Sequence, residues 1–506
     1  MRGAWRVADV RAAEDRVLAT VPPLTLMLRA AEGLARRCAG LLEAGGGVYG
    51  ARVLLLVGAG NNGGDALFAG ALLARRGAAV RAVLVSPEKA HADGLAELRR
   101  AGGQVTESIR DGADLVLDGI VGIGARGGLR GAAAEAAKAV DALEPRPLVV
   151  AVDVPSGVEV DTGAVEGMAL RADVTVTFGC LKPALVVGPA APLAGHVDVV
   201  DIGLSTLDAE PAVWLPDHED VAAWWPVPGP TSDKYTRGVV GLATGSPGYP
   251  GAALLSVAGA LAGPAGMVRY AGPVAADVVR AHPSVVVSDD VAGAGRVQAW
   301  LVGCGMGTDE RALHELRAVL AAPVPVVVDA DALTLAGDPS VRDAIRDRDA
   351  PTVVTPHDRE YARLAGEAVG SDRVAAAREL AARLGVVVLL KGDRSVVAAP
   401  DGGAWVNPTG VPALATAGTG DVLAGLLGAL LAGGVAADRA TLAAAYVHGL
   451  AARHAASPPT PSAALTGEDP EKTRNPHRRD GSWAPVTAPD VAASLPIVIG
   501  SLRNAY

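Results

Sequence analysis

A run of small residues near the C-terminal end carries one carboxylate that suits phosphoryl chemistry. The segment 407–425 reads NPTGVPALATAGTGDVLAG, and its last residues begin an apolar helical pattern. Glycine and threonine in such a loop can turn backbone N–H groups toward a phosphate at a helix N-terminus. Asp421 would then act as a base toward a hydroxyl substrate, and a nucleotide would supply the phosphate. Helix capping is the alternative role for Asp421, although capping does not require the three preceding small residues Gly418, Thr419 and Gly420.

Other loops of the C-terminal half also follow predicted strands. Ala252 ends a glycine-rich loop that begins at Gly245, and Gly305 lies within a Gly-Cys-Gly-Met-Gly sequence. His357 stands at a strand-to-helix turn with Glu360, where an imidazole either serves function or caps the helix.

A polar turn follows the next strand. It offers cationic and hydroxyl groups for a nucleotide, with an ordinary β-hairpin turn as the alternative, and consists of Lys391, Gly392, Asp393, Arg394 and Ser395. Asp329 and Asp331 can support a metal-bound phosphate or act as cap and turn residues, and we assign them no role.

The N-terminal half contains a glycine-rich turn between a strand and a helix. Gly58, Gly60 and Gly63 satisfy the G-x-G-x-x-G spacing of dinucleotide folds. The second strand, however, ends without an acidic residue that could bind a ribose hydroxyl. We therefore expect a phosphate-cradling loop and not a redox dehydrogenase.

Two more polar loops leave strands in the same half. Ligands of doubly wound sheets bind at the carboxyl ends of the strands. We therefore expect six side chains to converge, namely Asn61, Asn62, Asp65, Asp118, Asp153 and Ser156. Their oxygens suit a hard cation, and a carboxylate beside a ligand can move protons. Taken singly, these residues would be read as turn and capping residues.

Composition limits the class of protein. The chain has 506 residues, of which 50% are hydrophobic and 3% aromatic, so we expect two α/β domains rather than one core. The net charge of −10 argues against a nucleic-acid partner. The three cysteines have no paired spacing, so the sequence supports neither a disulfide framework nor a zinc site, and we expect a reducing compartment. We find no signal peptide and no apolar run long enough for a membrane span, and expect a cytoplasmic protein.

The elements that must position these loops alternate as strand and helix. In the first half we expect strands at 52–57, 80–85, 115–118, 148–152 and 174–178, with helices at 65–76 and 90–101. In the second half strands are expected at 238–243, 300–302, 326–329, 352–355 and 386–390, and helices at 421–431 and 439–454. We place the first domain at 1–210, a Pro- and Trp-rich linker at 211–230, and the second domain at 231–506. The segment 457–482 is expected to be flexible.

Both halves resemble one known family, the bifunctional NAD(P)H-hydrate repair enzymes, over almost the whole chain. The first half is similar to the NAD(P)H-hydrate epimerase domain through the motifs at 61–65, 118–124 and 152–157. The second half is similar to the ADP-dependent NAD(P)H-hydrate dehydratase domain through the motifs at 245–252, 355–357, 391–395 and 407–425. The resemblance implies an N-terminal Rossmann-like doubly wound sheet and a C-terminal ribokinase-like α/β domain.

The resemblance also implies roles for individual residues. In the epimerase, potassium would be held by Asn62, Asp118 and Ser156, and Asp153 would transfer protons at C6. The hydrated nucleotide would contact Asn61, Asn62, Gly63, Gly64, Asp65, Gly122, Ile123, Gly124, Ala125, Arg126, Gly127, Gly128 and Asp153. In the dehydratase, the hydrated cofactor would contact Ala252, Gly305, His357 and Asp421, and the adenine nucleotide would contact Lys391, Gly392, Asp393, Arg394, Ser395 and Gly420.

The implied reaction is phosphorylation of the C6 hydroxyl by ADP, followed by loss of phosphate to restore NADH or NADPH, with magnesium at the diphosphate. Cys304 stands where the family commonly has proline. We expect a homo-oligomer whose ligands are NADH or NADPH hydrates and ADP. Two alternatives stay open at this point: a small-molecule kinase of the ribokinase-like class, and a first half that only binds a nucleotide or a protein.

Overall fold

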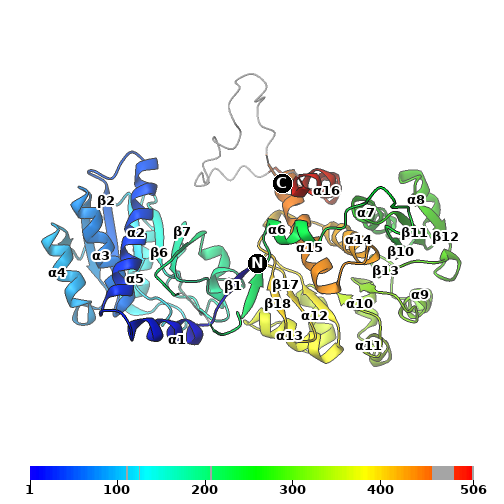
Figure 1. Ribbon diagram of the computed structural model, residues 1–506, viewed down its shortest axis with the longest axis horizontal. Coiled ribbons are helices and arrows are strands. Elements are labelled where there is room, and N and C mark those ends of the chain that lie inside the picture. Colours follow the sequence, from blue (N-terminus) through cyan, green and yellow to red (C-terminus); the bar gives the residue numbers. More distant parts are fainter. Residues whose placement is uncertain (110–111, 125, 205–207, 458–483, 504–506) are drawn as a thin grey trace, which may run out of the picture. The chain divides into compact units, whose positions relative to one another are not determined.

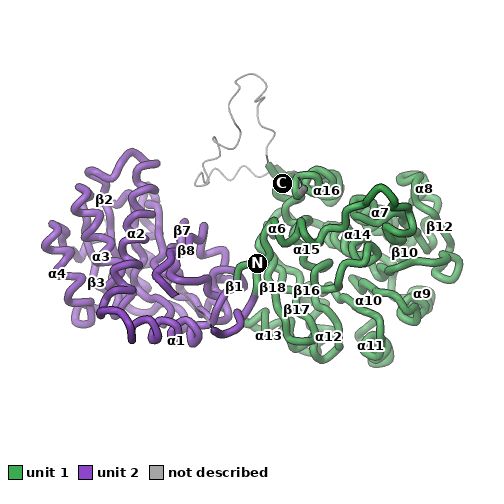
Figure 2. Tube along the Cα trace, in the orientation of Figure 1, with its two compact units in different colours: residues 1–2, 214–506 green, residues 3–213 purple. Residues whose placement is uncertain are grey.

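The computed structural model describes residues 1–109, 112–124, 126–204, 208–457 and 484–503 (Figure 1). The predicted flexible segment 457–482 lies outside these residues except for Ser457, and the predicted site residue Ala125 also lies outside them. The chain forms two compact units, residues 3–213 and residues 1–2 with 214–506 (Figure 2). Among the described residues, no helix is both long enough and apolar enough to cross a membrane.

The unit of residues 3–213 is built on a parallel sheet of order β4-β3-β2-β5-β6-β7-β8. Its strands are β2 (Arg52–Val57), β3 (Ala79–Leu84), β4 (Gln104–Val105), β5 (Leu115–Gly119), β6 (Leu148–Val152), β7 (Val174–Phe178) and β8 (His196–Val200). Its helices are α1 (Val7–Leu18), α2 (Thr25–Ala44), α3 (Asn61–Arg75), α4 (Ala92–Arg100) and α5 (Gly131–Asp141).

Helices cover both faces of this sheet. Alternate residues of β2 point to opposite faces: Leu55 packs in one core with α2 and α3, and Leu54 packs in another core with α5. A sheet buried on both faces needs continuous apolar strands, and β2 has this composition after its first residue. The predicted doubly wound architecture is therefore confirmed.

The larger unit contains a mixed sheet. Strands β10 to β16 are parallel to one another, and β17 runs antiparallel to both of its neighbours, β16 and β18. Its strands, with the short β1 and β9 in which the unit boundary falls, are β1 (Arg2–Ala4), β9 (Val213–Leu215), β10 (Val239–Ala243), β11 (Met267–Ala271), β12 (Val286–Ser288), β13 (Ala299–Val302), β14 (Val326–Val328), β15 (Thr352–Val354), β16 (Val387–Leu390), β17 (Val396–Ala398) and β18 (Ala404–Val406). Its helices are α6 (His218–Trp224), α7 (Pro250–Ala262), α8 (Ala275–Ala281), α9 (Glu310–Leu320), α10 (Asp331–Leu335), α11 (Pro339–Arg346), α12 (Asp358–Ala365), α13 (Arg373–Leu384), α14 (Thr419–Ala432), α15 (Ala437–Ala455) and α16 (Ala488–Arg503).

Helix α14 is apolar around nearly its whole circumference and lies buried against α7 and α15. Two glycines allow this close approach: a Cβ on Gly425 would lie 2.0 Å from the Ser256 carbonyl oxygen, and one on Gly259 would lie 2.1 Å from the Val422 carbonyl oxygen. This packing fixes the N-terminal end of α14, where Asp421 lies.

Two expectations about local structure differ from the structure. The helix expected from residue 65 begins at Asn61, because Gly60 takes a left-handed φ of 81° and starts the helix one turn earlier. The stretch 211–230, expected as a linker, contains β9 and α6, and α6 is begun by a capping box between Asp217 and Asp220.

Candidate active sites in the two units

In the smaller unit, the polar loops converge at the carboxyl ends of β2, β5 and β6. Asp118 is the penultimate residue of β5 and is fully buried. Its Oδ2 accepts a hydrogen bond from the Ser156 backbone N–H at 2.8 Å, and its Oδ1 accepts one from the Ser156 hydroxyl at 2.6 Å. Burial raises the pKa of Asp118 to about 6, even though these bonds favour its charged form.

Asn62 lies beside this pair in the first turn of α3. A Cβ on Gly122 would lie 2.7 Å from Asn62 Oδ1, so the loop passes close to this side chain. Asn62 Nδ2 is buried and has no hydrogen-bond partner among the described residues. The Asp118 carboxylate, the Ser156 hydroxyl and the Asn62 carboxamide oxygen together offer the oxygen ligands that a hard cation prefers.

Asp153 follows β6 and takes a left-handed φ of 68°. Its Oδ1 accepts three hydrogen bonds, from Lys182 Nζ at 2.6 Å, the Thr177 hydroxyl at 2.9 Å and the Phe178 backbone N–H at 3.1 Å. Lys182 is only 1% exposed. Asp153 is therefore bound through one oxygen to a buried cation, whereas its Oδ2 accepts no hydrogen bond from any described residue.

A cavity of about 420 Å³ opens next to this cluster. Its polar lining is Glu14, Asn61 and Asp65, and its apolar lining includes Leu18, Leu24, Leu26, Met27, Ala30, Phe178 and Ile202. Burial, and after it the charge of Asp153, raise the pKa values of Asp65 and Glu14 above those of free carboxyl groups. Burial thus favours the protonated form of both carboxyl groups, which stand near a carboxylate that is paired with lysine.

The loop 122–128 reaches several neighbours. Gly122 contacts Asn62, Gly124 lies near Arg11 of α1, and Gly128 packs against the backbone of residues 166–168. Ile123 is half-buried, while Gly124 and Arg126 are exposed. Gly63 packs on the Gly58 carbonyl, and Gly64 lies against Met27 and His91.

In the larger unit, Gly418 is the N-cap residue of α14, and Asp421 lies three residues later in the first turn of the helix. Asp421 is therefore not the N-cap residue. Burial raises the pKa of Asp421 to about 7, and the nearby charge of Asp329 adds to the rise. The oxygens of Asp421 and Asp329 and the Cys304 sulfur all lie within 4.8 Å of one another.

Lys391 links the polar turn to this group. Its Nζ lies 2.8 Å from Asp329 Oδ1 and 3.6 Å from Glu360 Oε2, and a Cβ on Gly420 would lie 3.8 Å from it. Burial by itself would lower the pKa of Lys391, but Asp329 and Glu360 raise it above its ordinary value. A cation is thus fixed beside the backbone that opens α14.

The other predicted residues of this unit are placed as follows. Ala252 and Gly305 are adjacent, since a Cβ on Gly305 would lie 2.5 Å from the Ala252 Cβ. His357 is the N-cap of α12: its Nδ1 accepts hydrogen bonds from the backbone N–H groups of Arg359 and Glu360. Its imidazole nevertheless stays 48% exposed, so capping leaves part of the ring free to contact a ligand.

The segment 391–395 forms the hairpin turn between β16 and β17. The Ser395 hydroxyl exchanges hydrogen bonds with the Gly392 backbone, and Arg394 Nη1 donates to the Pro408 carbonyl at 2.5 Å. Asp393 packs its carbonyl against Gly410. The hairpin alternative therefore describes the local structure correctly, and of this group it is Lys391 that reaches the carboxylates.

Several residues of these sites were given no role from the sequence. Asp329 follows β14 directly, and that position was a usable signal. Glu360 was noted beside His357 without a role. Lys182 is a single lysine in an apolar segment, which gives only a weak signal, and Glu14 reaches its site through the packing of α1, which the sequence does not reveal.

Comparisons with known proteins identify the family of the chain. Residues 240–468 match the family model described as NAD(P)H-hydrate dehydratase, and residues 23–184 match the one described as YjeF-related protein N-terminus. The bifunctional NAD(P)H-hydrate repair enzyme Nnr of Mycobacterium tuberculosis H37Rv is 49% identical over 87% of this chain and 91% of its own. The chain belongs to this family.

The enzyme of the same name from Mycobacterium leprae is 48% identical and covers 91% of this chain and 96% of its own. A crystal structure of an ADP/ATP-dependent NAD(P)H-hydrate dehydratase from Bacillus subtilis, with ATP and Mg²⁺, is 28% identical and covers 57% of this chain and 99% of its own, with a TM-score of 0.47. The membership confirms the resemblance found from the motifs. It also confirms the prediction of a nicotinamide nucleotide repair enzyme with two activities.

Proposed function

We propose that the larger unit dehydrates the S form of NADH or NADPH hydrate at the expense of ADP. The observation that carries this proposal is Asp421, a buried carboxylate with a pKa of about 7 at the start of a helix whose first turn faces Lys391. A base is most useful when its pKa lies near the working pH. A helix N-terminus beside a lysine is suited to hold a diphosphate.

In the proposed reaction, Asp421 takes the proton of the C6 hydroxyl while that oxygen attacks the β-phosphorus of ADP and AMP leaves. The C6–O bond then breaks, phosphate departs, and loss of a proton from C5 restores the C5=C6 double bond. Lys391 and the backbone N–H groups around Gly420 hold the phosphates, and Ala252, Gly305 and His357 contact the nicotinamide ring. Mg²⁺ would neutralise charge on the diphosphate when bound.

For the smaller unit, we propose interconversion of the R and S hydrates. C6 of the hydrate carries both a hydroxyl and the ring nitrogen, so removal of the hydroxyl proton and protonation of the nitrogen open the ring. Closure on the other face of C6 then inverts the centre. Asp153 Oδ2 would accept the hydroxyl proton, because Lys182 Nζ donates to the other oxygen, Oδ1.

The cavity beside Asp153 would hold the nicotinamide end of the substrate, with Asn61 and Asp65 in contact. Potassium would be bound by Asn62, Asp118 and Ser156, whose buried oxygens fit it, and would supply a fixed positive charge. The three described cysteines are buried free thiols, in keeping with a reducing compartment, and the cytoplasm stays our prediction for the location.

Pure R hydrate with ADP tests both assignments together, because NADH returns only if the chain epimerises and then dehydrates. We expect one AMP and one phosphate for each NADH. A phosphorylated product that accumulates without NADH would favour the small-molecule kinase instead. Recovery from S hydrate alone would leave the smaller unit as a binding module.

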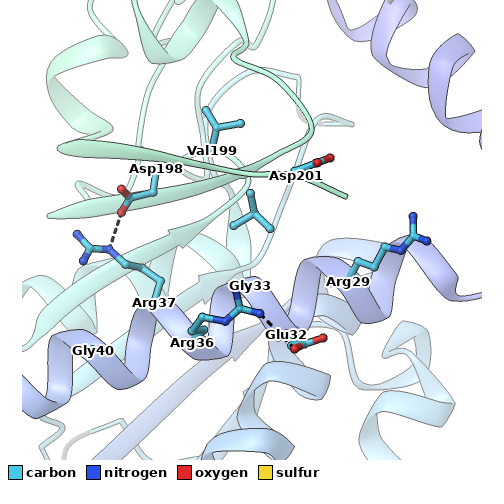
Figure 3. Close-up of a pocket in the computed structure, with 10 residues that line it drawn as sticks. Arg29, Glu32, Gly33, Arg36, Arg37, Gly40, Asp198, Val199 and Asp201 are labelled. Carbon is cyan, nitrogen blue, oxygen red and sulfur yellow. Dashed lines mark hydrogen bonds and ion pairs between the residues drawn. The ribbon is translucent and has the colours of Figure 1, made fainter. Parts of the chain in front are cut away.

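We further propose that the enzyme is a homodimer that uses the groove between α2 and β8 (Figure 3). The groove encloses about 550 Å³ and carries three arginines and three acids, Arg29, Arg36, Arg37, Glu32, Asp198 and Asp201. β8 ends the sheet of the described strands, and Val199 on it is 46% exposed. A two-fold interface needs a self-complementary patch. This groove carries both positive and negative side chains, and it lies beside the edge strand of the sheet of the described strands.

Sedimentation velocity of the full chain tests the dimer. We expect Val199→Asp to shift the protein to monomer. Val105→Asp, on the strand at the opposite end of the same sheet, is the matched control and should leave the dimer intact. A wild-type protein that stays monomeric at all concentrations, or equal behaviour of the two variants, would refute this interface.

A further inference from the structure

Cys304 brings a sulfur ligand next to two carboxylates of the dehydratase site. The three side chains come from different elements: Cys304 follows β13, Asp329 follows β14 and Asp421 lies in the first turn of α14. Cys304 is fully buried, and Asp329 is 2% exposed. Their sulfur and carboxylate oxygen ligand atoms, with that of Asp421, all lie within 4.8 Å of one another.

The separation of the first two ligands suits a small tetrahedral cation. Cys304 Sγ lies 3.7 Å from Asp329 Oδ2. With a Zn–S distance of about 2.3 Å and a Zn–O distance of about 2.1 Å, tetrahedral geometry separates the sulfur from the oxygen by about 3.6 Å. Asp329 Oδ1 accepts a hydrogen bond from Lys391 Nζ, and Oδ2 accepts one from the Cys304 thiol. Loss of the thiol proton would free Oδ2 for a cation.

Charge in the cluster also favours a cation. Lys391 pairs with Asp329 and approaches Glu360, whereas Asp421 has no cationic partner within salt-bridge distance among the described residues. Asp421 is nevertheless largely enclosed, and the carboxylates of Asp329 and Asp331 add to the negative potential around it. A divalent ion would neutralise this unpaired carboxylate and leave its fourth coordination position for water.

We propose that Cys304, Asp329 and Asp421 bind a thiophilic divalent cation such as Zn²⁺, and that the bound ion switches the dehydratase off. The inhibitory part rests on the proposed role of Asp421 as base, since a carboxylate bound to Zn²⁺ cannot accept a proton. The binding part rests on the ligand geometry alone. Mg²⁺ prefers six oxygen ligands and avoids sulfur, so the ion that accompanies ADP does not compete well for this cluster.

Coordination requires the thiolate, so the Cys304 thiol loses its proton to solvent when the ion binds.

Titration of the metal-free full chain with Co²⁺ tests binding without any assay of activity. A cobalt–thiolate bond gives a charge-transfer band in the near ultraviolet, and tetrahedral Co²⁺ gives strong visible bands. We expect both, with one equivalent of Co²⁺, and we expect Zn²⁺ to displace it. Cys304→Ala should lose the charge-transfer band, whereas Cys38→Ala, which removes another fully buried thiol, should keep it.

Inhibition by Zn²⁺ then tests the switch, with each variant compared with its own activity in the absence of zinc. The zinc concentration for half inhibition of dehydration should rise at least about 10-fold in Cys304→Ala and stay at the wild-type value in Cys38→Ala. Epimerisation by the same molecules is the internal control and should not respond.

Equal zinc sensitivity of wild type and Cys304→Ala would overturn the switch, and absence of the charge-transfer band in wild type would overturn the site. Thermal melting confirms that each variant is folded, and Cys304→Ser replaces Cys304→Ala if the latter is not. A protein that shows the cobalt band but performs no dehydration would refute the proposed function and leave the metal site standing.

Discussion

The replacement Asp421→Asn tests the base of the dehydratase most sharply. Asparagine keeps the size of the side chain and cannot take a proton. A positioned general base contributes about 10²- to 10⁴-fold to a rate, so we expect kcat for dehydration to fall by that factor. The site contacts of Lys391 and Gly420 do not involve the Asp421 carboxylate, so ADP affinity should change little.

The pH dependence of the dehydration rate is a second test of Asp421 as the base. With a pKa of about 7, Asp421 is about one tenth ionised at about pH 6 and about nine tenths ionised at about pH 8. Dehydration by the wild type should therefore rise about tenfold between these values and then level off. The residual rate of Asp421→Asn should lack this rise.

The assay follows the absorbance of NADH formed from S hydrate with ADP and Mg²⁺, while binding of ADP is measured by calorimetry. Asp401→Asn makes the same replacement in the exposed turn between β17 and β18, away from the site residues, and serves as the control variant. Epimerisation by the variant should match the wild type. Normal turnover of Asp421→Asn, or a wild-type profile that is flat between about pH 6 and 8, would refute the reasoning.

Four other predictions follow from the described contacts. Asp153→Asn should abolish conversion of R to S hydrate while dehydration of the S form continues; unchanged epimerisation would remove Asp153 from the mechanism. Lys182→Met leaves the Asp153 charge buried without its partner and should destabilise the smaller unit by about 3 to 5 kcal/mol, and Asp153→Asn added to it should restore much of that loss; thermal melting of the three variants decides this. Gly425→Ala places a Cβ 2.0 Å from the Ser256 carbonyl oxygen and should lower the free energy of unfolding by about 1 to 3 kcal/mol. Gly251→Ala in α7, with no atom within 4 Å of its Cβ, is the control and should show no measurable loss of stability in the same melting assay. The folded-state pKa of Asp421 lies above its unfolded value of about 3.9, so the contribution of this residue to stability falls as the pH rises from about 4 to about 7. Asp421→Asn should therefore raise the melting temperature above that of the wild type by more at about pH 8 than at about pH 5. An equal difference at the two pH values would contradict that pKa.

Much of the fold was predictable because buried parallel strands have a simple composition. The strands β6 and β7 agree with the expected ranges to the residue, since β6 is a short apolar run and β7 consists of β-branched and aromatic residues. The start of α3 was not predicted, because it depends on the left-handed conformation of Gly60, which spacing alone does not reveal. Helix α6 was missed because proline and tryptophan around it outweighed its capping box.

The candidate sites divide in the same way. Asp118, Asp153 and Asp421 follow strands or open a helix, so the topology of a parallel sheet was enough to find them. Lys182 and Glu14 depend on how a loop and α1 pack against the sheet, which is a tertiary property. Asp329 had the right position after β14, and its role became visible only through its contacts with Lys391 and Cys304.

Recovery of NADH absorbance from a mixture of R and S NADH hydrate tests the central claim most directly. The purified full chain would be supplied with potassium, magnesium and ADP, and the NADH formed compared with the total hydrate present. The two proposed activities predict complete recovery from both epimers. Recovery that stops at the S fraction would contradict the epimerase, and no ADP-dependent recovery would contradict the repair function.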